Sequence, residues 1–78
     1  MKTAPKLTAK QRRENAARAA HARQTLEAYA EITDIGEDDE TMLCDMLADF
    51  MHLMGREAVE GRMWMAAEHY EAERTGQE

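Results

Sequence analysis

The sequence is poor in cysteine and has no long apolar run. Cys44 is the one cysteine among 78 residues, so neither an internal disulfide nor a cysteine-based zinc site can form. A lone thiol is typical of a reducing compartment. No segment approaches the ~18 apolar residues of a membrane span, and no apolar stretch follows the basic N-terminus as in a signal peptide. We therefore expect a cytoplasmic protein that does not contact a membrane.

Large apolar side chains are also scarce, with one Trp, one Phe and two Tyr in the chain. A chain of this length forms one domain at most and buries only about 60% of its unfolded surface, so no enclosed substrate pocket is expected. There is no Gly-rich phosphate loop, and the acids around Cys44 oppose formation of its thiolate. These absences predict a protein that is not an enzyme and carries no cofactor. A thin core leaves a homodimer open as a source of further burial.

Proline occurs once, at Pro5, and glycine is absent from the first 35 residues. The residues between are mainly good helix formers such as Ala, Arg, Gln and Glu. Thr8 and Gln11 have the spacing of a capping box, which marks the start of a helix. The sequence thus predicts a disordered tail over residues 1–7 and a first helix over residues 8–32.

The clearest amphipathic pattern follows a glycine-containing loop. Apolar residues recur there at steps of three and four, which predicts a helix over residues 39–54 with Asp38 or Asp39 as its cap. They are Met42, Leu43, Met46, Leu47, Phe50, Leu53 and Met54. Gly55 follows at a position typical of helix ends. A third helix is predicted over residues 57–74.

These patterns predict an all-α fold with a single helical domain over residues 8–78. A long basic N-terminal helix would be joined to an acidic hairpin of two antiparallel helices. We expect the large residues of the apolar stripes to be the centre of stability, so that Phe50→Ala costs about 3 kcal/mol or more. These residues are Leu43, Leu47, Phe50 and Tyr70.

Charge is divided unequally along the chain, although the net charge is −6. Residues 1–26 hold seven basic residues against one acid, a net charge of +6. Residues 27–78 hold three basic residues against 15 acids, a net charge of −12. Such asymmetry is informative about partners. It is equally explained if the two parts attract each other within the chain or across a dimer, because surface charge alone is weak evidence.

Carboxylate and imidazole side chains share helix faces in both halves of the predicted hairpin. They are Asp45, Asp49 and His52 on one helix, and His69 and Glu73 on the other. Facing helices in bundles build metal sites from such groups, but the di-iron pattern needs two Glu-x-x-His motifs. This chain has one Asp-x-x-His and no second copy. A solvated face opposite the apolar stripe is the favoured interpretation, and no metal is expected.

An acidic, methionine-rich surface is the favoured interaction site. Methionine is common where a surface must adapt to its partner, although a thin core can also use it to fill gaps. Six acids in and after the loop form the candidate partner-binding set, together with the tryptophan as an apolar anchor. The set is Glu37, Asp38, Asp39, Glu40, Asp45, Asp49 and Trp64.

The first predicted helix offers a nucleic-acid-binding alternative. Its candidates are Arg12, Arg13, Arg18 and Arg23. The segment from Ala9 to Arg18 resembles the arginine-rich RNA-binding peptides of phage antitermination proteins, which also interleave Ala with Arg on a short helix. Those peptides have denser arginine and an aromatic that stacks on RNA. Because the chain as a whole is acidic, nucleic acid is the less favoured partner.

The C-terminal half resembles a group of short, uncharacterised proteins encoded by bacterial phages, plasmids and chromosomal islands. The shared outline is L-x-D-x-L-A-D-x-M-H, here residues 43–52, and after a glycine-containing loop A-x-x-H-Y-x-x-E, here residues 66–73. The group has no assigned activity. Mobile elements encode many small acidic proteins that block host defence complexes. Anti-CRISPR and anti-restriction proteins among them present acids where the host enzyme expects DNA phosphate.

These features predict a non-catalytic interaction protein of a phage or other mobile element, acting in the cytoplasm of a bacterial host cell. Its most concrete form is an acidic inhibitor of a host defence nuclease, similar to an anti-CRISPR protein and acting as a DNA mimic. The partner would be a basic, nucleic-acid-handling host protein that is attracted by charge. The alternative is a small nucleic-acid-binding regulatory adapter that uses the basic N-terminal helix.

Overall fold

The computed structural model describes residues 7–76, and all regular structure in that range is helical. Helix α1 spans Ala9–Thr33, α2 spans Asp39–Met54 and α3 spans Arg56–Thr75. The predicted all-α class is confirmed, and each predicted helix end lies within one residue of the observed one. Of the predicted tail, residues 1–6 lie outside the described residues. None of the described helices is both long and apolar enough to cross a membrane.

The ends of α1 follow from local side-chain chemistry. The Gln11 backbone N–H donates to the Thr8 hydroxyl at 3.0 Å, and the Thr8 backbone N–H donates to the Gln11 side chain at 2.8 Å. This is the predicted capping box, and it satisfies two backbone donors at the start of the helix. At the other end Asp34 takes the left-handed conformation with φ 55°, and its N–H donates to the Ala30 carbonyl. The helix therefore begins and ends where its sequence dictates.

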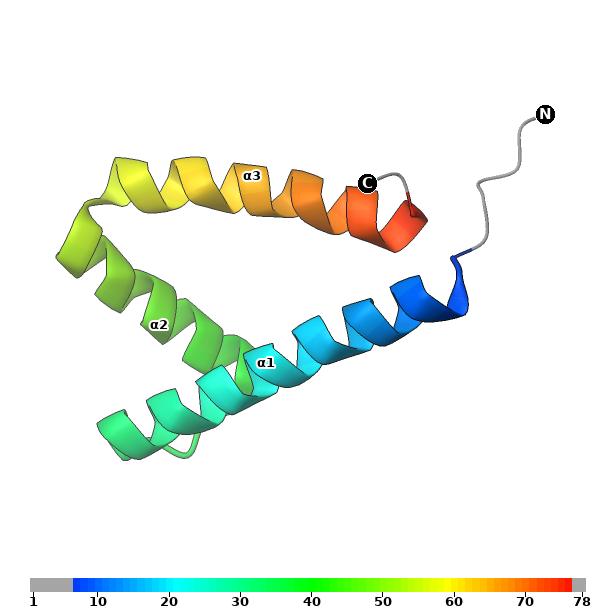
Figure 1. Cartoon of the computed structure of the whole chain (residues 1–78). Helices are drawn as coiled ribbons and strands as arrows, with labels where there is room; N and C mark the ends of the chain where they lie inside the picture. The colour runs from blue at the N-terminus through cyan, green and yellow to red at the C-terminus, as the bar shows by residue number, and fades with distance from the viewer. Residues whose placement is uncertain (1–6, 77–78) are drawn as a thin grey trace.

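Helix α2 begins at a carboxylate and ends at a glycine. The Thr41 backbone N–H donates to Asp38 at 2.7 Å, so Asp38 is the cap, as predicted. Gly55 has φ 95° and ψ 149°, a conformation that residues with a Cβ rarely adopt. It is the single residue between α2 and α3, so the chain turns sharply from one helix into the next (Figure 1).

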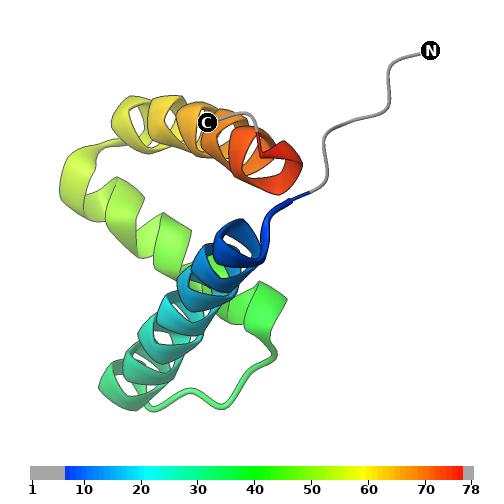
Figure 2. The same cartoon turned by 45° about the vertical axis from the view of Figure 1, so that its right-hand side comes forward.

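Helix α2 crosses the C-terminal half of α1 instead of folding straight back along it. Arg23 of α1 pairs with Asp39 at the start of α2, and the Tyr29 hydroxyl donates to Asp49 further along α2 at 2.7 Å. These contacts advance in the same direction along both helices. The loop of residues 34–38 therefore runs back alongside the last turns of α1, and α2 begins beside the middle of that helix (Figure 2).

Helix α3 returns to the N-terminal half of α1 and completes an open, three-sided arrangement (Figure 1). The Asn15 side-chain amide donates to the Glu73 carbonyl at 3.0 Å. The Arg18 guanidinium forms an ion pair with the Glu73 carboxylate at 3.1 Å. Polar contacts rather than a packed apolar layer therefore join α3 to α1.

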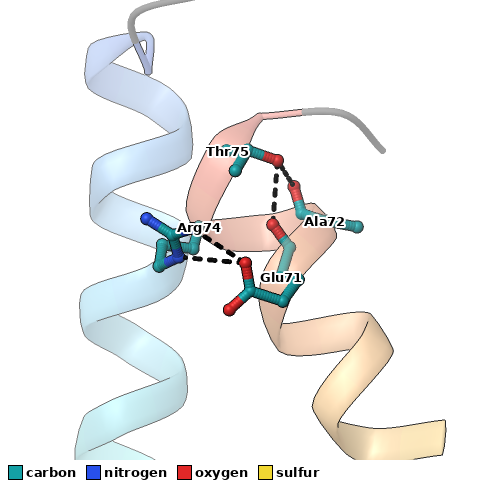
Figure 3. Close-up of polar contacts among 4 residues, drawn as sticks. All are labelled: Glu71, Ala72, Arg74 and Thr75. Atoms are coloured by element: carbon teal, nitrogen blue, oxygen red, sulfur yellow. Dashed lines mark hydrogen bonds and ion pairs between the residues drawn. The ribbon is translucent and has the colours of Figure 1, made fainter. Parts of the chain in front are cut away.

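The end of α3 is held by its own side chains (Figure 3). Arg74 donates to the Glu71 carboxylate at 2.8 Å, and the Thr75 hydroxyl donates to the Glu71 carbonyl at 2.8 Å. Gly76 follows with φ 75°, and a Cβ there would lie 3.2 Å from Leu7 Cδ2. Glycine therefore lets the end of α3 lie close to the residues that precede α1.

Very few side chains are buried. Met42 of α2 and Val59 of α3 are the only buried residues in the described part of the chain. The prediction that four large apolar residues form the centre of stability is therefore wrong for a single copy of the chain. Only Leu47 among them is half-buried. The other members are exposed, namely Leu43, Phe50 and Tyr70. The reason is that α1 and α3 diverge from α2, so neither covers the full length of its apolar stripe (Figure 1).

Alanine substitutions at two glycines test the turn between α2 and α3. Gly55→Ala is expected to lower the free energy of unfolding by about 1–3 kcal/mol, because a Cβ is strained at φ 95°. Gly61 is the matched control, because it lies inside α3 with open space where a Cβ would be. Gly61→Ala should raise the free energy of unfolding by about 0.5–1 kcal/mol. Denaturant unfolding followed by circular dichroism measures both, and effects of the same sign would contradict the assigned turn.

Candidate interaction surface

An apolar groove runs between α1 and α2. Its lining residues are Thr25, Ala28, Tyr29 and Ile32 of α1, and Met46, Asp49, Phe50 and Leu53 of α2. Ile32 is 82% exposed and Leu53 is 78% exposed, although both are large and apolar. Burying such a side chain is worth roughly 1.5–3 kcal/mol relative to leaving it in water. The groove therefore favours contact with another molecule.

A second apolar groove lies between α2 and α3 and shares Phe50 with the first. Its lining residues are Leu47, Phe50, Met54, Ala58, Val59, Arg62, Met63 and Ala66. Because Phe50 borders both grooves, they form one continuous surface over the three helices. Leu43 extends this surface along α2, where it lines a further groove with Met46. A continuous exposed apolar surface usually marks an interaction site in a soluble protein.

We name this surface the open apolar face. It is defined by Ile32, Leu43, Met46, Phe50, Leu53, Met54 and Met63. The sequence pattern identified its α2 members as a stripe but placed them in the core. The first predicted helix also has an apolar stripe that ends at Ile32, but nothing in the sequence shows that α2 leaves this end of α1 uncovered.

The acidic candidates at the start of α2 are exposed, but two of them stabilise the fold. Asp38 caps α2, and the hydrogen bond that it accepts lowers its pKa. Asp39 forms a two-pronged ion pair with Arg23, which lowers the pKa of Asp39 and raises that of Arg23. Glu37 and Glu40 are exposed and pair with no described residue. These two glutamates are therefore more available to a partner than the two aspartates.

Asp45 and Asp49 do not form the freely exposed face predicted for them. Asp45 is half-buried, and the exposed Asp49 accepts the hydrogen bond from the Tyr29 hydroxyl. That hydrogen bond raises the pKa of Tyr29 to about 12, with smaller contributions from lost hydration and from the charges of both aspartates. Replacing both aspartates by lysine would therefore disturb the contact between α1 and α2 as well as any partner site.

Trp64 lies on a different part of the molecule. It is 66% exposed and borders a shallow depression on α3 with Ala67, Glu68 and Glu71 among its neighbours. None of these residues lines either groove of the open apolar face. The structure therefore leaves the predicted apolar anchor accessible but does not gather it into one pocket with the acids of α2.

The four arginine candidates of α1 are engaged to different degrees. Arg18 and Arg23 form ion pairs with carboxylates of α3 and α2. Arg12 donates to a backbone carbonyl at 2.7 Å. Arg13 is exposed and forms no hydrogen bond or ion pair with a described residue. Attraction between the oppositely charged parts of the chain thus operates within one molecule.

The histidine and carboxylate pattern of the hairpin does not converge. Within residues 7–76, no three side chains of His, Cys, Asp or Glu come close enough together to hold a metal ion. Cys44 is exposed.

Comparisons of the chain with models of known protein families, with curated proteins and with solved structures gave no match. The surfaces described above are accordingly interpreted from their own geometry and charge.

Asp49→Asn tests the contact between α1 and α2. Loss of the acceptor charge should lower the pKa of Tyr29 from about 12 towards its ordinary value of about 10. In the wild type, the folded protein holds this proton more tightly than the unfolded chain does. The stabilising effect is therefore complete below about pH 10 and is lost as the pH rises towards 12.

Absorbance of the phenolate during an alkaline titration measures this pKa, in a Tyr70→Phe background that leaves a single tyrosine. His52→Asn, about one turn further along α2, is the control and should leave the titration unchanged. A titration of Tyr29 that does not respond to Asp49→Asn would rule out the hydrogen bond.

Asp39→Asn tests the ion pair with Arg23. The pKa of Asp39 lies below its ordinary 3.8 in the folded protein, so this carboxylate contributes stability above about pH 4. That contribution is lost as the pH falls through the folded pKa. Between pH 6 and pH 3, the melting temperature of the wild type should therefore fall further than that of Asp39→Asn. Glu40→Gln is the neighbouring control, and its melting temperature should fall as far as that of the wild type. Identical acid profiles for wild type and Asp39→Asn would exclude a stabilising pair.

Proposed function

We propose that the protein is a non-catalytic interaction protein that binds a basic, nucleic-acid-handling protein. In this proposal α1 is a basic helix, and α2 and α3 form an acidic antiparallel hairpin that presents the binding surface. The most concrete form is an inhibitor of a host defence nuclease, encoded by a phage or other mobile element and similar to an anti-CRISPR protein. The resemblance of residues 43–52 and 66–73 to proteins of mobile elements supports this form.

The observation that carries the proposal is the acidic segment of residues 24–55. It contains nine acids and no Lys or Arg, and it forms the end of α1, the loop and the whole of α2. Eight of the nine carboxylates are exposed, and Asp45 is half-buried. A concentrated negative field of this kind speeds encounter with a basic surface and repels nucleic acid.

Three of the acids in this segment have partners within the fold. They are therefore less available for contact with another protein. Asp38 caps α2, Asp39 pairs with Arg23, and Asp49 accepts from Tyr29. Exposed acids without a described partner are the better candidates for contact. They include Glu31, Glu37 and Glu40. Only the overall negative field needs to imitate phosphate, because the ~5.4 Å rise of a helix turn does not match the ~3.4 Å spacing along a DNA strand.

The test measures DNA cleavage by a panel of purified CRISPR effector and restriction nucleases, with and without the protein. At least one nuclease is expected to be inhibited. Glu37→Lys combined with Glu40→Lys should weaken that inhibition by about tenfold or more, because exposed charges at an interface govern association. Added salt should weaken it as well. Neither glutamate has a structural partner, so circular dichroism should show an unchanged fold.

Arg12→Glu combined with Arg13→Glu is the matched control, because it changes the charge by the same amount in the opposite direction. This variant should inhibit as well as the wild type. The absence of inhibition across the panel, or inhibition that survives the glutamate reversal, would contradict the proposal.

A nucleic-acid-binding adapter is the second candidate, favoured by the exposed Arg13 next to Arg12 in the N-terminal half of α1. Such an adapter would bind duplex DNA or structured RNA with an affinity that falls as salt rises. Retention on nucleic acid by the wild type, together with its loss in the double arginine variant, would replace the inhibitor by the adapter.

A further inference from the structure

The molecule exposes more surface than a compact chain of its mass. Its accessible area is 6622 Å², whereas a compact monomer of 8.9 kDa exposes about 4,800 Å². Within residues 7–76, ten large apolar side chains of the helices and of the loop between α1 and α2 are exposed. A standard interface needs only about 800 Å² from each partner.

The shape of the molecule leads to the same conclusion. Its radius of gyration is 15.4 Å, whereas about 11.5 Å is expected for a compact domain of 78 residues. Met42 and Val59 are the only buried side chains among the described residues, and they form a very small core for three helices. Small domains of this kind depend on a staple or on association. The open apolar face therefore needs an occupant whenever the chain is folded, and a second copy is the partner that is always present.

The α1–α2 groove has the residue spacing of a helical bundle. One row consists of Ala22, Thr25, Tyr29 and Ile32 on α1, and the other consists of Leu43, Met46, Phe50 and Leu53 on α2. Each row advances by three, four and three residues, which is the spacing of bundle and coiled-coil seams. Within one chain the rows end at Ile32 and Leu53, the most exposed large residues of the face. Two helices that present such rows can pack against a second pair of helices.

The charge of the molecule is complementary to itself. The end formed by residues 24–55 is acidic, as described above, whereas the first turns of α1 carry Lys10, Arg12 and Arg13, all exposed. A two-fold axis perpendicular to α1 places the basic end of one copy beside the acidic end of the other. Two copies aligned in the same direction would instead bring like charges together.

We propose that the protein forms a two-fold symmetric homodimer in which a second copy covers the open apolar face. The α1–α2 pairs of the two copies pack together, with the α1 helices running in opposite directions. The interface is isologous, so each copy buries its own Ile32, Phe50 and Leu53 against the other. Dimerisation supplies the apolar burial that a single chain lacks.

This dimer does not depend on the proposed function. Asp45 lies five residues before Phe50, roughly 140° around the axis of α2. Glu40 lines the groove where the apolar row of α2 begins, beside Leu43, and Glu37 precedes α2 in the loop. The dimer is measured on the protein alone, whereas inhibition is measured with a nuclease. Either proposal can therefore fail while the other holds.

Sedimentation equilibrium of the full chain alone is expected to give twice the 8.9 kDa mass. The melting temperature should rise with protein concentration, because unfolding is coupled to dissociation of the two copies. A mass of 8.9 kDa with a melting temperature independent of concentration would overturn the proposal. A poorly ordered monomer would also overturn it, because the occupant of the face would then be a different protein. A trimer or larger assembly would exclude the two-fold arrangement.

Leu53→Asp places a charge on the open apolar face. Each dimer carries the substitution twice, so the dissociation constant should rise by about a hundredfold or more. Trp64→Asp is the matched control, since Trp64 is similarly exposed but lies outside the face. The control should keep the dimer within about threefold of the wild-type constant.

A monomeric fold would tolerate Leu53→Asp, because this side chain is mostly in water within one copy. Loss of helix in Leu53→Asp but not in Trp64→Asp therefore supports the proposal as well, since it shows that folding depends on the covered face. A Leu53→Asp protein with the wild-type mass and the wild-type dependence of melting on concentration would show that another surface is used.

Discussion

The shortage of apolar surface that one chain can bury is the constraint on which the rest of this structure depends. Each helix has strong local signals, such as the capping box at Thr8 and the capping carboxylate of Asp38. Yet only Met42 and Val59 become buried when the helices come together. The helices are therefore well specified by local interactions, whereas the packing between them buries little apolar surface.

Polar contacts take the place of a core in setting the position of α1. Helix α2 is joined to α1 through the Arg23–Asp39 pair and the Tyr29–Asp49 hydrogen bond. Exposed pairs of this kind are individually weak, and salt screens them. The angle between α1 and α2 is therefore the feature most open to adjustment by whatever covers the open apolar face. The turn at Gly55 is set by backbone conformation and is less sensitive to such contacts.

Local structure could be predicted from the sequence, whereas tertiary placement could not. Helix ends depend on neighbours a few residues away, so the caps and the stop at Gly55 are visible in the sequence. The direction of α2 depends on the loop of residues 34–38, whose polar composition marks it as a loop but does not fix its path. A stripe of apolar residues likewise shows what must be covered, but not by which molecule. Phe50 was assigned to a core for this reason, and the acids that serve as internal partners could not be told from those that do not.

Dimerisation and partner binding involve the same acidic residues. Whether both can occur depends on how many of these acids the second copy neutralises. In the two-fold arrangement, Lys10, Arg12 and Arg13 of one copy face the acidic end of the other. Three cations neutralise only part of a segment with nine acids, and each copy keeps a net charge of −6. The assembly therefore retains an acidic surface at each of its two ends. Two equivalent surfaces on one particle can engage two basic sites at once, so a partner that is itself two-fold symmetric would be bound more tightly than either site alone allows.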